Sequence, residues 1–177
     1  FDAEAMAAAR REDGGRLWVA NVNAPGQVVV AGGTDDLAWA SAHASAFDIK
    51  RVIPLKVAGA FHSPFMATAA AQLGEALAGA SVARADFPVW ANATALPYTG
   101  DVAGTLVAQL TSPVRFADTL AGMAAAGVRR FVHVGPGDVT AGLAKRSVQG
   151  AEAITVSSVA DVPAAVATLA DMSTSID

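Results

Sequence analysis

The sequence predicts an α/β protein in which a small α+β unit precedes a parallel sheet covered by helices. Three observations predict this class. In the second half of the 177-residue chain, short runs rich in β-branched residues alternate with helical patterns, which is typical of a parallel sheet. The first half has a hairpin signal between two helical patterns. The composition, 53% apolar and 16% charged, is that of a globular protein with a core.

The hairpin signal is the tetrapeptide that ends in Pro25 and Gly26. Proline fixes φ and glycine accepts a positive φ, so the pair suits the two central positions of a type II turn. The elements expected around it are the end of an amphipathic helix over residues 5–11, strands over 17–20 and 28–31, a helix capped by Thr34 or Asp35 that runs to about Phe47, and an extended run over 51–55. This unit is expected to end near Val57.

After Pro64, which suits the first turn of a helix, apolar residues recur at helical spacing to Leu77. Beyond this helix the patterns predict strands over 89–91, 130–134 and 154–156, the second of them buried, and helices over 102–110, 114–126, 139–147 and 162–170. The tail over 173–177 is expected to fray.

Composition excludes several classes of function. The net charge of −4 and the absence of a long basic run argue against nucleic-acid binding. No apolar stretch approaches the ~20 residues of a membrane span. Without cysteine, thiolate metal sites are excluded and a reducing cytoplasm is suitable. His43, His62 and His133 lack ligand spacing, so neither a metal nor a cofactor is expected. The chain begins without Met or a signal sequence, which indicates processing or a larger parent.

His62 is the strongest candidate for chemistry. It lies in the loop Gly59-Ala60-Phe61-His62-Ser63, where the chain is expected to pass from a strand to a helix, and such loops commonly reach a cleft. Imidazole titrates near neutral pH, so it can act as a base toward a hydroxyl and as an acid toward a leaving thiolate. The alternative is a loop histidine hydrogen-bonded to backbone.

Two further loops have a functional interpretation and a structural one, and the residues alone favour the structural one. Gly135-Pro136-Gly137 lies between a strand and a helix and could offer N–H groups to an anion, or it is only a tight turn. Asn21 and Asn23 either line a site or support the hairpin turn through bonds to backbone. No Gly-x-Ser-x-Gly nucleophile elbow occurs in the chain, so a self-contained serine hydrolase is not expected.

Four motifs in register resemble one known family. They are VANVNAPGQVVVAG from Val19, PLKVAGAFHS from Pro54, LVAQLTSPVRF from Leu106, and VGPG from Val134 followed by GLAKR from Gly142. Together they resemble the C-terminal part of malonyl-CoA:acyl carrier protein transacylases and of the related polyketide synthase acyltransferase domains. The resemblance covers roughly residues 17–156.

The resemblance implies ping-pong transfer of a malonyl group from malonyl-CoA to the phosphopantetheine thiol of acyl carrier protein, in fatty acid or polyketide biosynthesis. It implies that His62 is the general base and acid, and that the main-chain carbonyl of Gln109 orients its ring. Ala60 and Phe61 would shape the acyl pocket and favour malonyl over methylmalonyl. By the same resemblance, Asn21 and Asn23 border the cleft, and Lys50 and Arg51 meet the acidic carrier protein or, alternatively, form a solvated strand edge.

The resemblance also implies a division into two subdomains and the absence of several family motifs from this sequence. Residues 1–57 would be most of a ferredoxin-like subdomain inserted into a hydrolase-like α/β domain, and residues 58–177 would be the C-terminal portion of that larger domain. The family's Gly-His-Ser elbow, its oxyanion-hole segment and its malonate-binding arginine precede the matched region. The chain alone is therefore expected to be inactive and to need the N-terminal portion of the same enzyme. The alternative is a truncated, non-catalytic module that binds carrier protein or serves in assembly.

Overall fold

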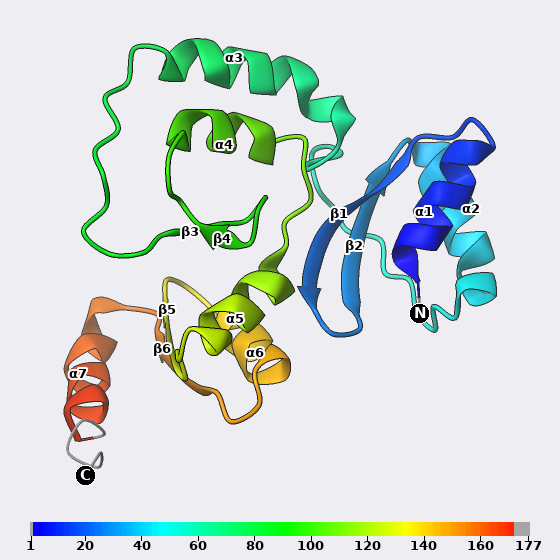
Figure 1. Cartoon of the computed structure of the whole chain (residues 1–177). Coiled ribbons are helices and arrows are strands. Elements are labelled where there is room, and N and C mark those ends of the chain that lie inside the picture. Colours follow the sequence, from blue (N-terminus) through cyan, green and yellow to red (C-terminus); the bar gives the residue numbers. More distant parts are fainter. Residues whose placement is uncertain (1, 172–177) are drawn as a thin grey trace. The chain divides into compact units, whose positions relative to one another are not determined.

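The computed structural model describes residues 2–171 (Figure 1), and the chain divides into two compact units, Phe1–Thr119 and Leu120–Asp177. The first unit contains α1 (Ala3–Glu12), β1 (Leu17–Ala24), β2 (Gln27–Gly32), α2 (Thr34–His43), η1 (Ala44–Phe47), η2 (Pro64–Met66), α3 (Ala67–Leu77), β3 (Trp90–Ala91), β4 (Leu96–Pro97) and α4 (Val102–Gln109). After α5 (Phe116–Ala125), which crosses the boundary, the second contains β5 (Arg130–Val134), α6 (Val139–Ser147), β6 (Glu152–Val156), η3 (Val159–Asp161) and α7 (Val162–Asp171). The predicted α/β class is confirmed.

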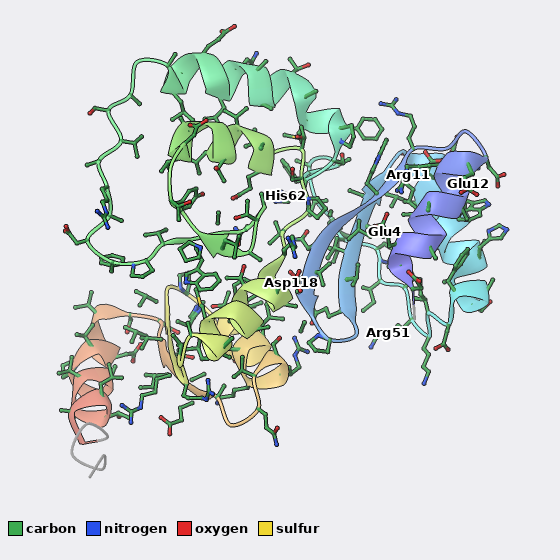
Figure 2. All side chains as sticks on the ribbon, viewed as in Figure 1. Glu4, Arg11, Glu12, Arg51, His62 and Asp118 are labelled. Atoms are coloured by element: carbon green, nitrogen blue, oxygen red, sulfur yellow. The ribbon has the colours of Figure 1, made fainter. Side chains whose placement is uncertain are left out.

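The helix α1 contains the predicted residues 5–11 and begins at Ala3. Asp2 caps it by accepting a hydrogen bond from the Ala5 N–H at 2.8 Å, which satisfies one of the free donors of the first turn. Glu4 and Arg11 form an ion pair of 3.0 Å along this helix (Figure 2).

The predicted hairpin is confirmed and is longer than expected. β1 and β2 pair in antiparallel fashion from Leu17 and Gly32 to Ala24 and Gln27, and Gly26 takes the positive φ of 74° that the turn requires. The register shifts twice along β1, so Ala20 and Asn23 are extra residues on that strand.

The helix α2 is capped differently from the prediction. Neither Thr34 nor Asp35 is the cap, because the helix begins one residue earlier, after Gly33, which has no side chain to accept a bond. Asp36 instead lies buried beside Arg10, at 2.7 Å. Apolar residues of α1, β1, β2 and α2 form the core of this part; they are Met6, Ala7, Leu17 and Ala40, with Val30, Trp39, Phe47 and Ile49 packed against them.

The extended run expected over residues 51–55 is not part of a strand. A strand exists through its ladder of hydrogen bonds, and among the described residues the one backbone bond to this segment is local, from the Val57 N–H to the Leu55 carbonyl at 3.2 Å. Its apolar side chains are consequently exposed; Ile53 and Leu55 each retain 58% of their surface.

The helices predicted after Pro64 and over 102–110 are confirmed as η2–α3 and α4, which pack side by side (Figure 1). Between them lies a short hairpin of β3 and β4, of which only β3 was predicted. The helix predicted from Val114 begins at Phe116 instead, because Val114 pairs with β1.

The second unit contains a parallel pair of strands, β5 and β6, with α6 packed against both. Two expectations are corrected here. The parallel sheet consists of two strands among the described residues, and β5 is not buried, since Val132 and Val134 expose 42% and 78% of their surface. The predicted frayed tail lies outside the described residues.

Candidate functional site

The loop over residues 48–63 ends in a backbone conformation that is uncommon for a side-chain-bearing residue. His62 has a φ of 56°, in the left-handed region, which costs roughly 1–2 kcal/mol for residues other than glycine. Such conformations persist where surrounding contacts hold them, and they cluster at functional sites. The His62 side chain is half-buried, and it belongs to the loop that joins η1 to η2 (Figure 2).

The buried side chain of Ser63 stabilises the end of this loop through two hydrogen bonds to backbone. Its side chain is fully buried, its hydroxyl donates a hydrogen bond to the Ala60 carbonyl at 2.5 Å, and its oxygen accepts one from the Phe65 N–H at 3.3 Å. Ser63 is also the N-cap of η2, with Pro64 at the first helical position. The turn that presents His62 is therefore fixed by the residue that follows it.

Gln109 is the second component of the site. It is the last residue of α4, and a helix leaves the carbonyls of its last turn without intrahelical partners. The carbonyl of Gln109 accepts a hydrogen bond from Nδ1 of His62 at 3.0 Å. A carbonyl oxygen only accepts, so Nδ1 carries the proton and the neutral ring keeps a lone pair on Nε2.

A pairing with β1 holds the end of α4 in place. The Val114 N–H donates to the Ala20 carbonyl and the Val22 N–H donates to the Val114 carbonyl, both at 2.8 Å. Asn21 is the bridge partner of Val114, and both Asn21 and Asn23 are half-buried. Within residues 2–171 neither asparagine side chain makes the turn-supporting bond to backbone that was one alternative.

The two residues expected to shape an acyl pocket, Ala60 and Phe61, come immediately before His62 in the chain. Phe61 exposes 46% of its surface, whereas Ala60 is half-buried and its carbonyl is occupied by Ser63. An aromatic cluster that the sequence analysis missed lies just after this loop. Phe65 meets Trp18 edge-on with ring centroids 5.6 Å apart, and the Arg16 guanidinium lies 3.9 Å from the Phe65 ring centroid.

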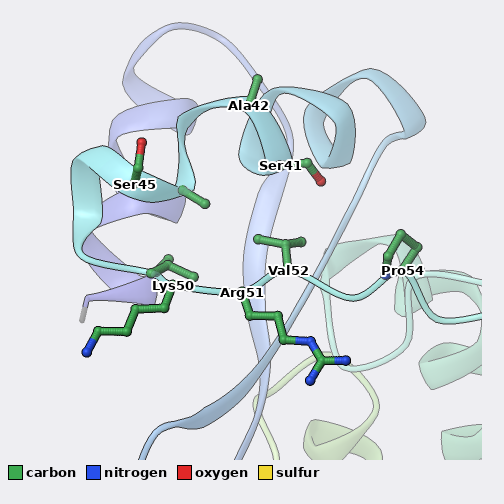
Figure 3. Close-up of a pocket in the computed structure, with 9 residues that line it drawn as sticks. Ser41, Ala42, Ser45, Lys50, Arg51, Val52 and Pro54 are labelled. Atoms are coloured by element: carbon green, nitrogen blue, oxygen red, sulfur yellow. The ribbon is translucent and has the colours of Figure 1, made fainter.

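Lys50 and Arg51 lie at a different place on the first unit. Both are exposed and line an open hollow beside α2 and η1 (Figure 3). The other lining residues are Ser41, Ala42, Ala44, Ser45, Ile49, Val52 and Pro54. The hollow includes neither His62 nor Gln109.

In the second unit, His133 pairs with a side chain and not with a main-chain carbonyl as His62 does. Its Nδ1 pairs with the Thr140 hydroxyl of α6, and the Gly135-Pro136-Gly137 segment forms a bend in which both glycines have positive φ. Asp138 precedes α6 without a capping bond from its side chain.

No cluster of three or more potential metal ligands occurs in the described part of the chain, and no helix there is long and apolar enough to cross a bilayer.

The geometry supports proton transfer at Nε2 of His62. Its hydrogen-bonded Nδ1–H fixes the ring orientation, as an acceptor does for the histidine of serine hydrolases. Ser63 does not serve as the adjacent nucleophile, because its hydroxyl proton is directed to the Ala60 carbonyl and its side chain is buried. The candidate base His62 thus has no hydroxyl partner among the groups described.

Comparison with known proteins identifies the family of this chain. The family model "Acyl transferase domain" matches residues 2–169, and the chain belongs to this family. A malonyl CoA-acyl carrier protein transacylase from Bacillus subtilis (strain 168) is 39% identical over 160 residues, which are 89% of this chain and 50% of that relative.

Solved structures of malonyltransferases are also similar to this chain. An acyl carrier protein S-malonyltransferase from Vibrio cholerae O1 superposes with a TM-score of 0.86 at 34% identity, over 93% of this chain and 55% of its own. A malonyl-transacylase in complex with a type II polyketide acyl carrier protein superposes with a TM-score of 0.88 at 32% identity, over 95% and 56%. The chain therefore spans about half the length of these relatives.

Proposed function

We propose that this chain contributes the general base to a transacylase that moves a malonyl group from malonyl-CoA to the phosphopantetheine thiol of acyl carrier protein. The observation that carries the proposal is the hydrogen bond from Nδ1 of His62 to the Gln109 carbonyl at 3.0 Å. It leaves Nε2 as the basic atom of a ring that cannot turn freely. Family membership of residues 2–169 supports the reaction class.

In the proposed first half-reaction, Nε2 of His62 takes the proton of a serine hydroxyl as the serine oxygen attacks the thioester carbonyl. The tetrahedral intermediate collapses, and the departing CoA thiolate receives the proton from His62. The second half-reaction runs in the opposite sense. His62 deprotonates the phosphopantetheine thiol, the thiolate attacks the serine ester, and the serine leaves with the proton. The serine belongs to a part of the enzyme that this sequence does not include.

The remaining site residues have narrower proposed roles. Phe61 and Ala60 would border the acyl group, and the exposure of Phe61 supports this position. A pocket that distinguishes one methyl group is worth about 1–3 kcal/mol, so Phe61→Ser should relax the preference for malonyl over methylmalonyl, measured as a ratio of kcat/KM values. Asn21 and Asn23 would border the cleft, and Lys50 and Arg51 would contact the carrier protein.

The proposed domain organisation follows the same family. Residues 1–57 would be most of a ferredoxin-like subdomain, because α1 and α2 both pack on the β1–β2 hairpin. Residues 58–177 would be the C-terminal portion of a hydrolase-like domain. Parallel strands are normally covered on both faces, so the exposed apolar residues of β5 support a missing portion that completes this sheet. The proposed location is the cytoplasm, which suits a chain without cysteine.

One alternative function has an observation in its favour. The chain has no nucleophile elbow, which also suits a non-catalytic module that binds carrier protein or serves in assembly. A single experiment distinguishes the two. The complete protein that carries this sequence is incubated with malonyl-CoA, digested, and searched by mass spectrometry for the malonyl ester.

The proposal predicts a malonyl ester on a serine outside these 177 residues, and no label on the 177-residue chain alone. A malonyl ester on Ser63 or on another serine of this chain would contradict the division of roles between base and nucleophile. The absence of any ester from the complete protein would favour the non-catalytic module.

A further inference from the structure

The end of α4 has an acceptor that its own helix does not use. The Leu110 N–H donates to the Val107 carbonyl and the Thr111 N–H donates to the Ala108 carbonyl, each at 3.2 Å. The next bond of this series would run from the Ser112 N–H to the Gln109 carbonyl, and it does not form among the described residues. Within residues 2–171 the Gln109 carbonyl accepts a hydrogen bond from His62 and from no other group.

Position 113 explains why this acceptor stays available. In a continued α-helix the carbonyl of residue 109 would accept from the N–H of residue 113. Residue 113 is proline, which has no N–H and also disfavours helical conformation in the residue before it. Its ring is exposed, so buried packing does not account for its presence here.

We propose that Pro113 is a positioning residue for His62: because it has no N–H, it keeps the Gln109 carbonyl free to accept the Nδ1–H of that histidine. The chain joins β1 immediately afterwards through Val114, so Pro113 acts at the junction between the helix that supplies the acceptor and the strand that anchors it. The catalytic meaning of this role rests on the function proposed above, whereas the hydrogen bond itself does not.

The proposal is tested with two replacements of Pro113 that share one side chain. Pro113→Ala introduces an N–H, and lactic acid incorporated at the same position has the same methyl group with an ester oxygen in place of that N–H. Pro88→Ala, at another exposed proline in a loop, measures the general cost of losing a proline ring. The readout is the tautomer of His62 in the complete protein that carries this sequence, followed by ¹⁵N NMR of the imidazole and assigned by comparison with His62→Gln.

In the parent protein, the lactic acid variant and Pro88→Ala, the Nδ1–H tautomer is expected to predominate. In Pro113→Ala its fraction should fall by about a factor of two or more, because the new N–H lets the helix continue and turns the Gln109 carbonyl toward residue 113 and away from the His62 ring. If Pro113→Ala unfolds while the lactic acid variant folds, the effect is again due to the N–H. An unchanged tautomer in Pro113→Ala, an equal loss in both variants, or unfolding of both would overturn the proposal. The tautomer measurement requires no acyl transfer. If the complete protein transfers no malonyl group, the proposed function is refuted, and the positioning role of Pro113 is still decided by the tautomer of His62.

Discussion

At the residue scale, His62 is held by groups that lie before and after it in the chain. Its left-handed backbone is enclosed by the Ser63 hydroxyl, which bonds back to Ala60. Its ring is tied to Gln109, 47 residues further along. The unfavourable backbone conformation is thus offset by hydrogen bonds to the loop backbone and to the side chain, which hold the His62 ring in place without a substrate.

A second residue-scale feature is the Arg10–Asp36 ion pair of 2.7 Å that connects α1 to α2. Burial by itself would raise the pKa of Asp36, but the hydrogen bond from Arg10, hydrogen bonds from the backbone of Arg16 and Gly33, and the Arg10 charge lower it below the ordinary value. A carboxyl whose pKa is depressed on folding stabilises the folded state above its unfolded pKa, about 3.9 for aspartate, and that contribution is lost as the pH falls through the folded value.

Asp36→Asn should therefore lower the urea midpoint of the complete protein at pH 7, and the difference from the parent should shrink below about pH 4. Asp35→Asn is the matched control, because Asp35 lies in the same first turn of α2 and is exposed. It removes a similar helix-dipole interaction without disturbing Arg10. Equal effects of the two substitutions at pH 7 would show that the ion pair contributes nothing specific.

At the element scale, the segments defined by local signals were predictable and those defined by distant partners were not. The proline at the start of η2 and the apolar spacing of α3 gave that helix correctly, and the Pro25-Gly26 pair gave the hairpin. β4 was missed, and no strand formed over residues 51–55, because a strand requires a partner that no local pattern identifies. The Ser63 cap was not predicted, although a serine directly before a proline at a helix start is a local signal for it.

The candidate site follows the same division. The loop composition identified His62 as a candidate base, but the contact with Gln109 joins residues 47 positions apart and no periodicity indicates it. Only the resemblance to a known family suggested that contact. The role inferred for Pro113 depends on the helix end, which becomes visible once α4 is known to stop at Gln109.

The extended segment that follows η1 provides an element-scale prediction. Lys50 and Arg51 both lie exposed at the rim of the hollow beside α2 (Figure 3). If they contact an acidic carrier protein, Lys50→Glu with Arg51→Glu should raise KM for acyl carrier protein, and more so at low salt, with KM for malonyl-CoA unchanged. Lys56→Glu with Arg84→Glu makes the same change of charge at other exposed positions. A KM that rises equally in both double variants would indicate net charge rather than a contact surface.

At the scale of the whole molecule, the chain exposes many large apolar side chains. Ile53, Leu55, Phe87, Val134 and Val159 each expose more than half of their surface. The chain also spans half of the B. subtilis relative. Apolar surface of this kind is normally covered by another element or partner, and the rest of a transacylase fold is the proposed cover.

The isolated 177-residue chain is accordingly expected to unfold over a broad temperature range, without a single cooperative transition. Circular dichroism of a dilute sample gives the transition, and light scattering confirms that the sample is monomeric. A sharp, reversible melt of a monomer would show that the chain forms a complete folding unit, contrary to this expectation.

In the proposed mechanism, Nε2 of His62 transfers the proton in malonyl transfer and the Gln109 main-chain carbonyl orients its ring. The most direct test is the single-turnover rate of malonyl-enzyme formation in the complete protein, compared with its His62→Ala and Gln109→Ala variants. His62→Ala should slow acylation by at least ~10²-fold, the usual scale for a lost general base, and Gln109→Ala should slow it far less because the carbonyl is retained. Acylation by His62→Ala at the parent rate, or equal losses in the two variants, would contradict the account.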